Sequence, residues 1–179
     1  MNERMTTDEA IALFDSLEPA TAEQMIGHWR GEGVDTDHPM DGMLESSYWH
    51  GKVFEGPEAV FPLVHNIPLW GRMSINPALL PMRLATVLPL RDTIGPWLVP
   101  VVAPLVRTWK PRARLRTIEF RGRAHAAMVY DAKPINDVFA RYDNDSVLGW
   151  MDGKGMDKPY FFKLFREASQ ESSKGSRSE

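Results

Sequence analysis

The sequence has no cysteine. This absence excludes disulfides, thiolate metal sites and a cysteine nucleophile, and it fits a reducing compartment. Long apolar runs are also missing: the longest, Ile94 to Val106, has 13 residues and three prolines, whereas a membrane-spanning helix needs roughly 20 apolar residues. Basic residues are not in excess, because the formal net charge is −3, which argues against a nucleic-acid-binding protein. The first ten residues lack the features of an export signal, so we expect a cytoplasmic protein.

What is present fits one globular domain of 179 residues, of which 43% are hydrophobic. The charges are unevenly spread along it. Residues 1–60 hold three Lys or Arg against thirteen Asp or Glu, a net charge of −10, and residues 107–123 hold seven against one, a net charge of +6. Because this basic stretch follows the apolar one, residues 94–123 predict either transient contact with a membrane surface or a basic rim that pairs with the acidic first third.

The first 75 residues predict short elements. Thr6 and Glu9 have capping-box spacing, which indicates an amphipathic helix from Thr6 to Leu17, and Thr21 to Gln24 is a second capped turn. The glycine-rich segment around Trp29 favours a strand. Residues 43–49 are typical of a short helix, and we expect another at residues 58–64, broken by a proline.

The middle of the chain, residues 76–111, is rich in proline and apolar side chains. Such proline density excludes a long regular element, so we expect short helical turns that act as a lid, as part of the core or as an interface. The seven prolines of this segment are Pro77, Pro81, Pro89, Pro96, Pro100, Pro104 and Pro111.

The C-terminal third predicts an antiparallel meander, because short aromatic and β-branched runs alternate with tight turns. The expected strands are Arg114 to Phe120, Arg123 to Tyr130, Ile135 to Tyr142, Ser146 to Met151 and Tyr160 to Phe165. With strands near Trp29 and at residues 48–54, they favour a mainly β fold closed into a barrel. We expect one barrel domain over residues 1–168, divided at 21–75, 76–111 and 112–168, and a disordered tail at 169–179.

One short motif, Gly27-x-Trp29-x-Gly31, resembles the signature of the GXWXG-motif family, small bacterial proteins whose C-terminal half is a domain of unknown function. The second half of the chain agrees in its segments 112–116, 120–122, 128–131, 134–135 and 149–155. The resemblance implies a lipocalin-like or fatty-acid-binding-like barrel with a hydrophobic interior. It also implies that Trp29 lies across the closed end, against an arginine from a late strand, either Arg116 or Arg166.

These features predict a carrier or sensor of a hydrophobic small molecule, a lipid or fatty acid, bound inside the barrel. An inward arginine or tyrosine would hold the polar head of the ligand, and outward-facing rim positions are the alternative for each. We expect no cofactor, and the five histidines show no metal-ligand spacing. The candidate ligand-binding residues are Trp29, Trp49, Arg116, Tyr130, Arg141, Tyr142 and Trp150.

Two other functions stay open. Asp137 lies mid-strand on an apolar face, so it is either a structural partner of Arg141 or Arg123, or the acid–base residue of a small barrel enzyme with an apolar substrate. The motif around Trp29 also resembles the opening of nitrobindin-type haem barrels. Those barrels ligate iron through a histidine near the C-terminus, whereas the last histidine here is His125.

Overall fold

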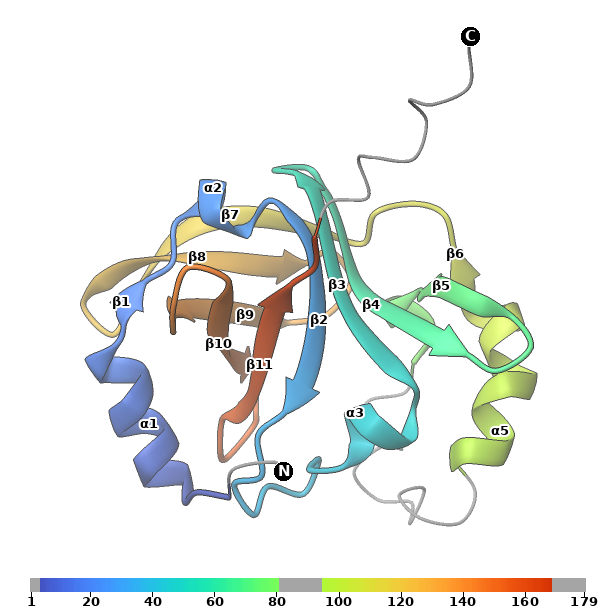
Figure 1. Ribbon diagram of the computed structural model, residues 1–179, viewed down its shortest axis with the longest axis horizontal. Coiled ribbons are helices and arrows are strands. Elements are labelled where there is room, and N and C mark those ends of the chain that lie inside the picture. Colours follow the sequence, from blue (N-terminus) through green and yellow to red (C-terminus); the bar gives the residue numbers. More distant parts are fainter. Residues whose placement is uncertain (1–3, 81–94, 169–179) are drawn as a thin grey trace, which may run out of the picture.

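The computed structural model describes residues 4–80 and 95–168, and its centre is a closed antiparallel barrel of eight strands (Figure 1). In ring order, each strand pairs with the next as β3-β2-β11-β10-β9-β8-β7-β4, and β4 pairs with β3 to close the ring. The mainly β, closed-barrel prediction is therefore confirmed. The strands are β2 (Gly27–Gly33), β3 (Trp49–Gly56), β4 (Ala59–Ile67), β7 (Ala113–Phe120), β8 (Arg123–Tyr130), β9 (Ile135–Arg141), β10 (Ser146–Gly153) and β11 (Tyr160–Arg166).

Three short strands and several helices surround the ring. Strand β5 (Gly71–Ile75) extends the sheet beyond β4, β6 (Arg107–Thr108) pairs with β5, and β1 (Glu18–Pro19) pairs with β9. The helices are α1 (Thr7–Ser16), α2 (Ala22–Met25), α3 (Met43–Ser46), η1 (Pro77–Leu79), α5 (Gly95–Val102) and η2 (Ala103–Val106). Both predicted capping boxes, at Thr6 and at Thr21, are present. None of the helices within the described residues is long and apolar enough to cross a membrane.

The prediction of a short helix at residues 58–64 is wrong, because this segment belongs to strand β4. Pro62 fits a strand here because the ladder bulges at this point: Gly51 pairs with Val64 and Val53 pairs with Phe61, so two residues of β4 face Lys52 alone. Proline is tolerated at bulges, where no ladder hydrogen bond is lost. The bulge also leaves the Pro62 carbonyl 3.3 Å from the Lys52 Nζ, which donates to it.

The barrel strands are buried on both faces over much of their length. Large side chains fill the interior, among them Trp29, Phe54 and Phe139, each at most 1% exposed. A second cluster lies outside the ring, where α1 inserts Phe14 over strands β8 to β10. Because both faces are apolar, alternation along β10 does not separate its inner from its outer side chains.

The proline-rich segment forms short helical turns where it is described. Helices α5 and η2 pack on β5 through a third cluster that contains Ile67, Met73, Ile75 and Ala103. In Figure 1, α5 lies on the side of the barrel opposite α1. Residues 81–94, part of the segment expected to act as a lid, and the tail 169–179, expected to be disordered, lie outside the described residues.

Candidate ligand site in the barrel

One end of the barrel is closed around Trp29. Its indole Nε1 donates to the Met25 carbonyl of α2 at 2.8 Å, and the side chain is 1% exposed. The Arg166 guanidinium lies 4.3 Å from the centre of the Trp29 ring and donates to the carbonyls of Gln24 (2.6 Å) and Ile26 (2.9 Å). Of the two arginines that the resemblance implied, Arg166 is thus the one that covers Trp29.

The last glycine of the motif makes room for a second tryptophan. A Cβ at Gly31 would lie 2.0 Å from the Trp49 Cη2, so only glycine leaves space for this ring. Gly149 has the same relation to Phe162, whose ring atoms would lie 2.4 Å from a Cβ. The rings of Trp49 and Phe162 meet edge to face at 5.9 Å. The glycines therefore position large aromatic rings in the interior.

A pocket of about 680 Å³ lies where the β2–α3 loop meets the beginning of β11. We call it the end pocket. Its wall carries four carboxylate residues, Asp35, Asp37, Asp41 and Glu45, together with Arg4, and Tyr160 contributes the inner wall. Since four acidic side chains outnumber the one arginine, the mouth of the end pocket is acidic.

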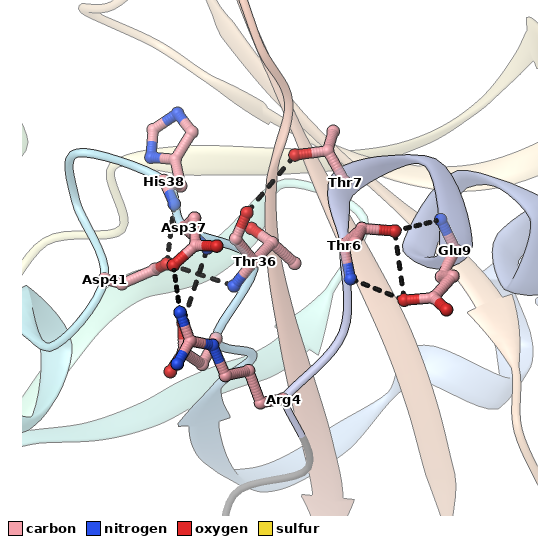
Figure 2. A network of polar contacts seen from close by, with 9 residues as sticks. Arg4, Thr6, Thr7, Glu9, Thr36, Asp37, His38 and Asp41 are labelled. Atoms are coloured by element: carbon pink, nitrogen blue, oxygen red, sulfur yellow. Dashed lines mark hydrogen bonds and ion pairs between the residues drawn. The ribbon is translucent and has the colours of Figure 1, made fainter.

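A hydrogen-bond network holds the loop of the end pocket in place (Figure 2). The Asp41 Oδ2 accepts from the backbone N–H groups of Thr36 at 3.0 Å and His38 at 2.6 Å, and Arg4 pairs with Asp37 at 2.8 Å. Burial raises the pKa of Asp41, and the two N–H donors act in the opposite direction. The loop is thus fixed by its own side chains.

An ion pair is buried inside the ring. The Lys52 Nζ lies 2.8 Å from the Asp137 Oδ2, and the two side chains are 2% and 0% exposed. Three aromatic rings surround the ammonium group, those of Phe162, Trp49 and Tyr130, at 4.9, 5.4 and 5.9 Å. Cation–π attraction therefore adds to the attraction of the carboxylate.

The predicted arginine partners of Asp137 are wrong. Arg141 is exposed, and Arg123 donates instead to the Leu17 carbonyl at 2.7 Å and to Glu18 at 3.1 Å. Closure of the barrel places Lys52 of β3 next to Asp137, across the interior from β9. This partner is far away in sequence, so no local pattern points to it.

Burial dominates the electrostatics of this cluster. It raises the pKa of Asp137, while the Lys52 ammonium acts in the opposite direction. Burial also raises the pKa of Tyr130 well above its usual range, and the nearby Asp137 carboxylate adds to that shift. His65, which is 7% exposed, has its pKa lowered to about 4, first by burial and then by Lys52.

The Trp49 Nε1 has no hydrogen-bond partner among the described residues. Neither Asp137 oxygen makes a hydrogen bond of good geometry there, although the Lys52 Nζ lies 2.8 Å from Oδ2 and the Tyr130 side chain also interacts with the carboxyl group. Buried polar atoms are nearly always paired in proteins. The indole N–H of Trp49 is thus a buried donor that the described residues leave unsatisfied, next to the Asp137 carboxyl group.

Strand register connects this cluster with the end pocket. Asp137 pairs with Met151, and Met151 pairs with Tyr160, so the three residues form one inward row across β9, β10 and β11. Tyr160 is also the inner wall of the end pocket. Two strand spacings, about 10 Å, separate its backbone from that of Asp137.

The other candidate residues lie outside the ring. Trp150 packs beneath α1, with its ring 5.3 Å from Phe14, and Tyr142 is 44% exposed. Arg116 donates to the Pro57 carbonyl at 2.9 Å and, like Arg141, takes the outward-facing alternative. His125 also faces α1, stacked on Phe14 at 5.3 Å. Of the seven candidates, the structure brings Trp29, Trp49 and Tyr130 into the interior cluster.

Sequence reasoning missed Lys52 and the end pocket. The one signal for Lys52 is a lysine within the apolar strand Trp49–Gly56, where a charge needs a partner. The pocket residues carry no such signal, because Asp and Gly also favour ordinary loops. In the described part of the chain, no group of three His, Asp or Glu side chains is placed to hold a metal ion.

Comparison with known proteins agrees with the motif at the closed end. The model of the GXWXG protein family matches residues 12–66, and the model described as domain of unknown function DUF4334 matches residues 111–166. The chain belongs to the GXWXG family. In this GXWXG protein, the first matched segment contributes β2, β3 and β4 to the ring, and the second contributes β7 to β11. Both segments are therefore needed to close one barrel.

A crystal structure of a protein from Thermomonospora curvata is similar to this GXWXG protein over most of its length. The two are 30% identical, the match covers 92% of this chain and 90% of that chain, and the TM-score is 0.69. The comparison with curated proteins gives no match. The likeness extends to the barrel as a whole and carries no statement about a ligand.

Proposed function

We propose that this protein binds a hydrophobic small molecule inside the barrel, with the polar group of the ligand at Lys52, Asp137 and Trp49. The observation that carries the proposal is the buried ion pair, which lies among aromatic rings beside an indole N–H that has no hydrogen-bond partner among the described residues. Burying an ion pair is costly for stability, so such pairs are often retained for a purpose other than folding.

The chemistry of the cluster defines the class of ligand. A hydroxyl, amide or carboxyl group can donate to the Asp137 carboxyl group and accept from the Trp49 Nε1, which satisfies the indole N–H. A fatty acid fits if one proton is shared between its carboxyl group and Asp137, because two adjacent carboxylates do not both ionise. The ammonium of Lys52 then balances the remaining negative charge. The apolar part of such a lipid gains about 0.8 kcal/mol per buried methylene.

The end pocket is the proposed entrance. The opposite end is covered by α2, Trp29 and Arg166, whereas the end pocket reaches Tyr160, which shares an inward row with Asp137. Met151 lies between Tyr160 and Asp137 in that row, and methionine side chains adapt readily to a new neighbour. A ligand that displaces Met151 and Tyr160 therefore reaches the ion pair.

The test compares two tryptophan variants in a binding titration with a fluorescent fatty acid. Trp49→Phe keeps an aromatic ring but removes the unpartnered N–H, so we expect affinity to fall by about 5- to 10-fold, the value of one net hydrogen bond. Trp150→Phe is the matched control, because Trp150 lies outside the ring beneath α1, and its affinity should equal that of the wild type. Equal affinities for all three proteins, or no binding at all, would refute the proposal.

An enzyme is the second candidate, favoured by the raised pKa of Asp137 and by its two proton-carrying neighbours, Lys52 and Tyr130. A carboxyl group of this kind can transfer a proton to or from an apolar substrate. Turnover of any such substrate should be lost in Asp137→Asn, which keeps the side-chain shape. Full turnover in that variant would remove this candidate.

A further inference from the structure

The side of the molecule that carries α5 exposes an unusual number of large apolar side chains. Leu69 is 99% exposed, Leu105 80%, Trp109 75% and Val101 70%. These residues come from the β4–β5 turn, from α5 with η2, and from the end of β6, which lie on the same side in Figure 1. We call Leu69, Trp70, Val101, Leu105 and Trp109 the apolar patch. Exposed apolar groups of this extent mark a contact surface.

The apolar patch is part of the folded structure. The Trp70 Nε1 donates to the Pro100 carbonyl at 3.1 Å, which ties the β4–β5 turn to α5. Beneath the patch, Ile67, Met73, Ile75 and Ala103 form a buried cluster, each at most 4% exposed. The exposed side chains therefore stand on a fixed support and do not depend on a partner for their position.

The described elements that carry the patch hold only basic charged residues. These are Arg72, Arg107 and Lys110, of which Arg72 pairs with Glu167 at 3.1 Å. Arg107 lies against the Trp109 ring at 4.5 Å, and neither Arg107 nor Lys110 forms an ion pair with a carboxylate of the described residues. The apolar patch therefore lies next to Arg107 and Lys110, two cations without a carboxylate partner among the described residues. The β4–β5 turn, β5, α5, η2 and β6 contain no acidic residue.

The rest of the molecule strengthens this asymmetry. Helix α1 has Asp8 and Glu9 in its first turn and no basic residue in its last turn, and it lies on the side opposite α5 (Figure 1). On the α1 side, Arg121 and Arg123 pair with Asp15 and Glu18, whereas the α5 side presents cations without a carboxylate partner among the described residues, and a negatively charged surface therefore attracts that side.

We infer that the apolar patch docks on the surface of a membrane that contains anionic lipids. Tryptophan side chains prefer the membrane interface, where the ring is apolar and the N–H meets water, and the patch offers Trp70 and Trp109. Arg107 and Lys110 attract the anionic headgroups, while Val101 and Leu105 enter the acyl region. This inference does not depend on the interior ligand, because no residue of the patch belongs to the ion-pair cluster.

Flotation with vesicles tests the docking surface. One set of vesicles is phosphatidylcholine alone, and the other contains about 30% phosphatidylserine, whose negative charge attracts basic residues near the surface. We expect the full chain to float with the anionic vesicles and to bind the neutral ones at least tenfold more weakly. High salt should weaken binding, because counterions screen the charges. A chain that floats with neither set overturns the inference.

Two pairs of matched variants locate the contact. Val101→Glu with Leu105→Glu should abolish flotation, whereas Ile26→Glu, at a 40% exposed apolar side chain directly after α2, should not. Arg107→Gln with Lys110→Gln should lower vesicle affinity by roughly 10- to 30-fold, from the usual effect of two cations near an anionic surface. Lys154→Gln with Lys158→Gln removes the same charge from the exposed β10–β11 turn and should leave the affinity unchanged.

Two further measurements exclude misfolding and self-association as explanations of the flotation result. Circular dichroism shows whether each variant is folded, and Lys52→Met should float normally if it folds, which separates docking from interior binding. Sedimentation velocity examines self-association. If the wild type is a dimer that Val101→Glu with Leu105→Glu dissociates, and it does not bind vesicles, the patch belongs to a second copy of the chain and the inference is wrong.

Discussion

Replacement of Lys52 by methionine should destabilise the protein more than any surface change. Methionine nearly matches the length of lysine and keeps contact with the rings of Trp49 and Phe162, but it leaves Asp137 without the ammonium 2.8 Å away. Asp137 is 0% exposed, so water cannot take the place of that ammonium. Breaking a buried ion pair on one side costs about 3–5 kcal/mol, a large part of the roughly 5–15 kcal/mol by which domains are stable.

The assay is urea unfolding followed by tryptophan fluorescence at several pH values. At pH 7 we expect the Lys52→Met deficit in unfolding free energy to be about 3–5 kcal/mol. Because burial raises the pKa of Asp137 above its ordinary 3.8 and the opposing ammonium is gone, the folded variant favours a protonated carboxyl. The deficit should therefore shrink as the pH falls from the raised pKa towards 3.8.

A double variant provides the control. Lys52→Met with Asp137→Leu removes both charges and leaves an apolar interior, which is often neutral for stability. It should therefore be more stable than Lys52→Met alone. A Lys52→Met deficit below about 1 kcal/mol at pH 7, the range of surface ion pairs, would show that the pair is not desolvated. A double variant that loses the sum of both single changes would show that the two side chains do not interact.

Three further predictions concern other contacts. Gly31→Ala places a Cβ 2.0 Å from the Trp49 ring, so thermal unfolding should show a loss of about 1–3 kcal/mol, partly restored by adding Trp49→Leu. The pKa of His65 is about 4 in the fold against 6.5 ordinarily, so its contribution to stability is complete above pH 6.5 and is lost as the pH falls towards 4. This loss is about 2 kcal/mol at pH 5, and a slope that persists in His65→Gln would contradict it. Thr6→Ala removes a helix cap and should cost about 1 kcal/mol in urea unfolding.

The C-terminal strands could be predicted because their turns are encoded locally. Arg121 and Gly122 both have positive φ, 52° and 76°, as the tight hairpin between β7 and β8 requires. The capping boxes at Thr6 and Thr21 are equally local, since each involves residues three positions apart. In these regions, a few neighbouring residues determine the structure.

The incorrect or missing predictions concern segments whose structure depends on contacts with residues far away in the sequence. Pro62 indicates a broken helix by itself, but the bulge opposite Lys52 accommodates it in a strand. Strands β5 and β6 were missed because five and two residues are too short to show a period. Trp150 is among the candidate ligand-binding residues, and its place outside the ring depends on α1, which covers the outer face of β10 in a way that the sequence does not indicate.

The candidate site likewise contains one residue that the local sequence identifies and one that it does not. Asp137 stands out because it is an acidic residue between Ile135 and Phe139 on an apolar face. Its partner does not, since Lys52 precedes it by 85 positions and approaches it only when the ring closes. Long-range pairs of this kind leave no spacing in the sequence.

The closure of the ring also bears on how the chain emerges from the ribosome. Strand β2 is made early, but its neighbour β11 begins at Tyr160, 93 residues after the end of β4 at Ile67. At a synthesis rate of roughly 5–20 residues per second, the three-stranded β2–β4 sheet waits about 5–20 s with an uncovered edge. Such edges pair readily with other chains. Ribosome-associated chaperones are therefore the factors on which the yield of this barrel should depend.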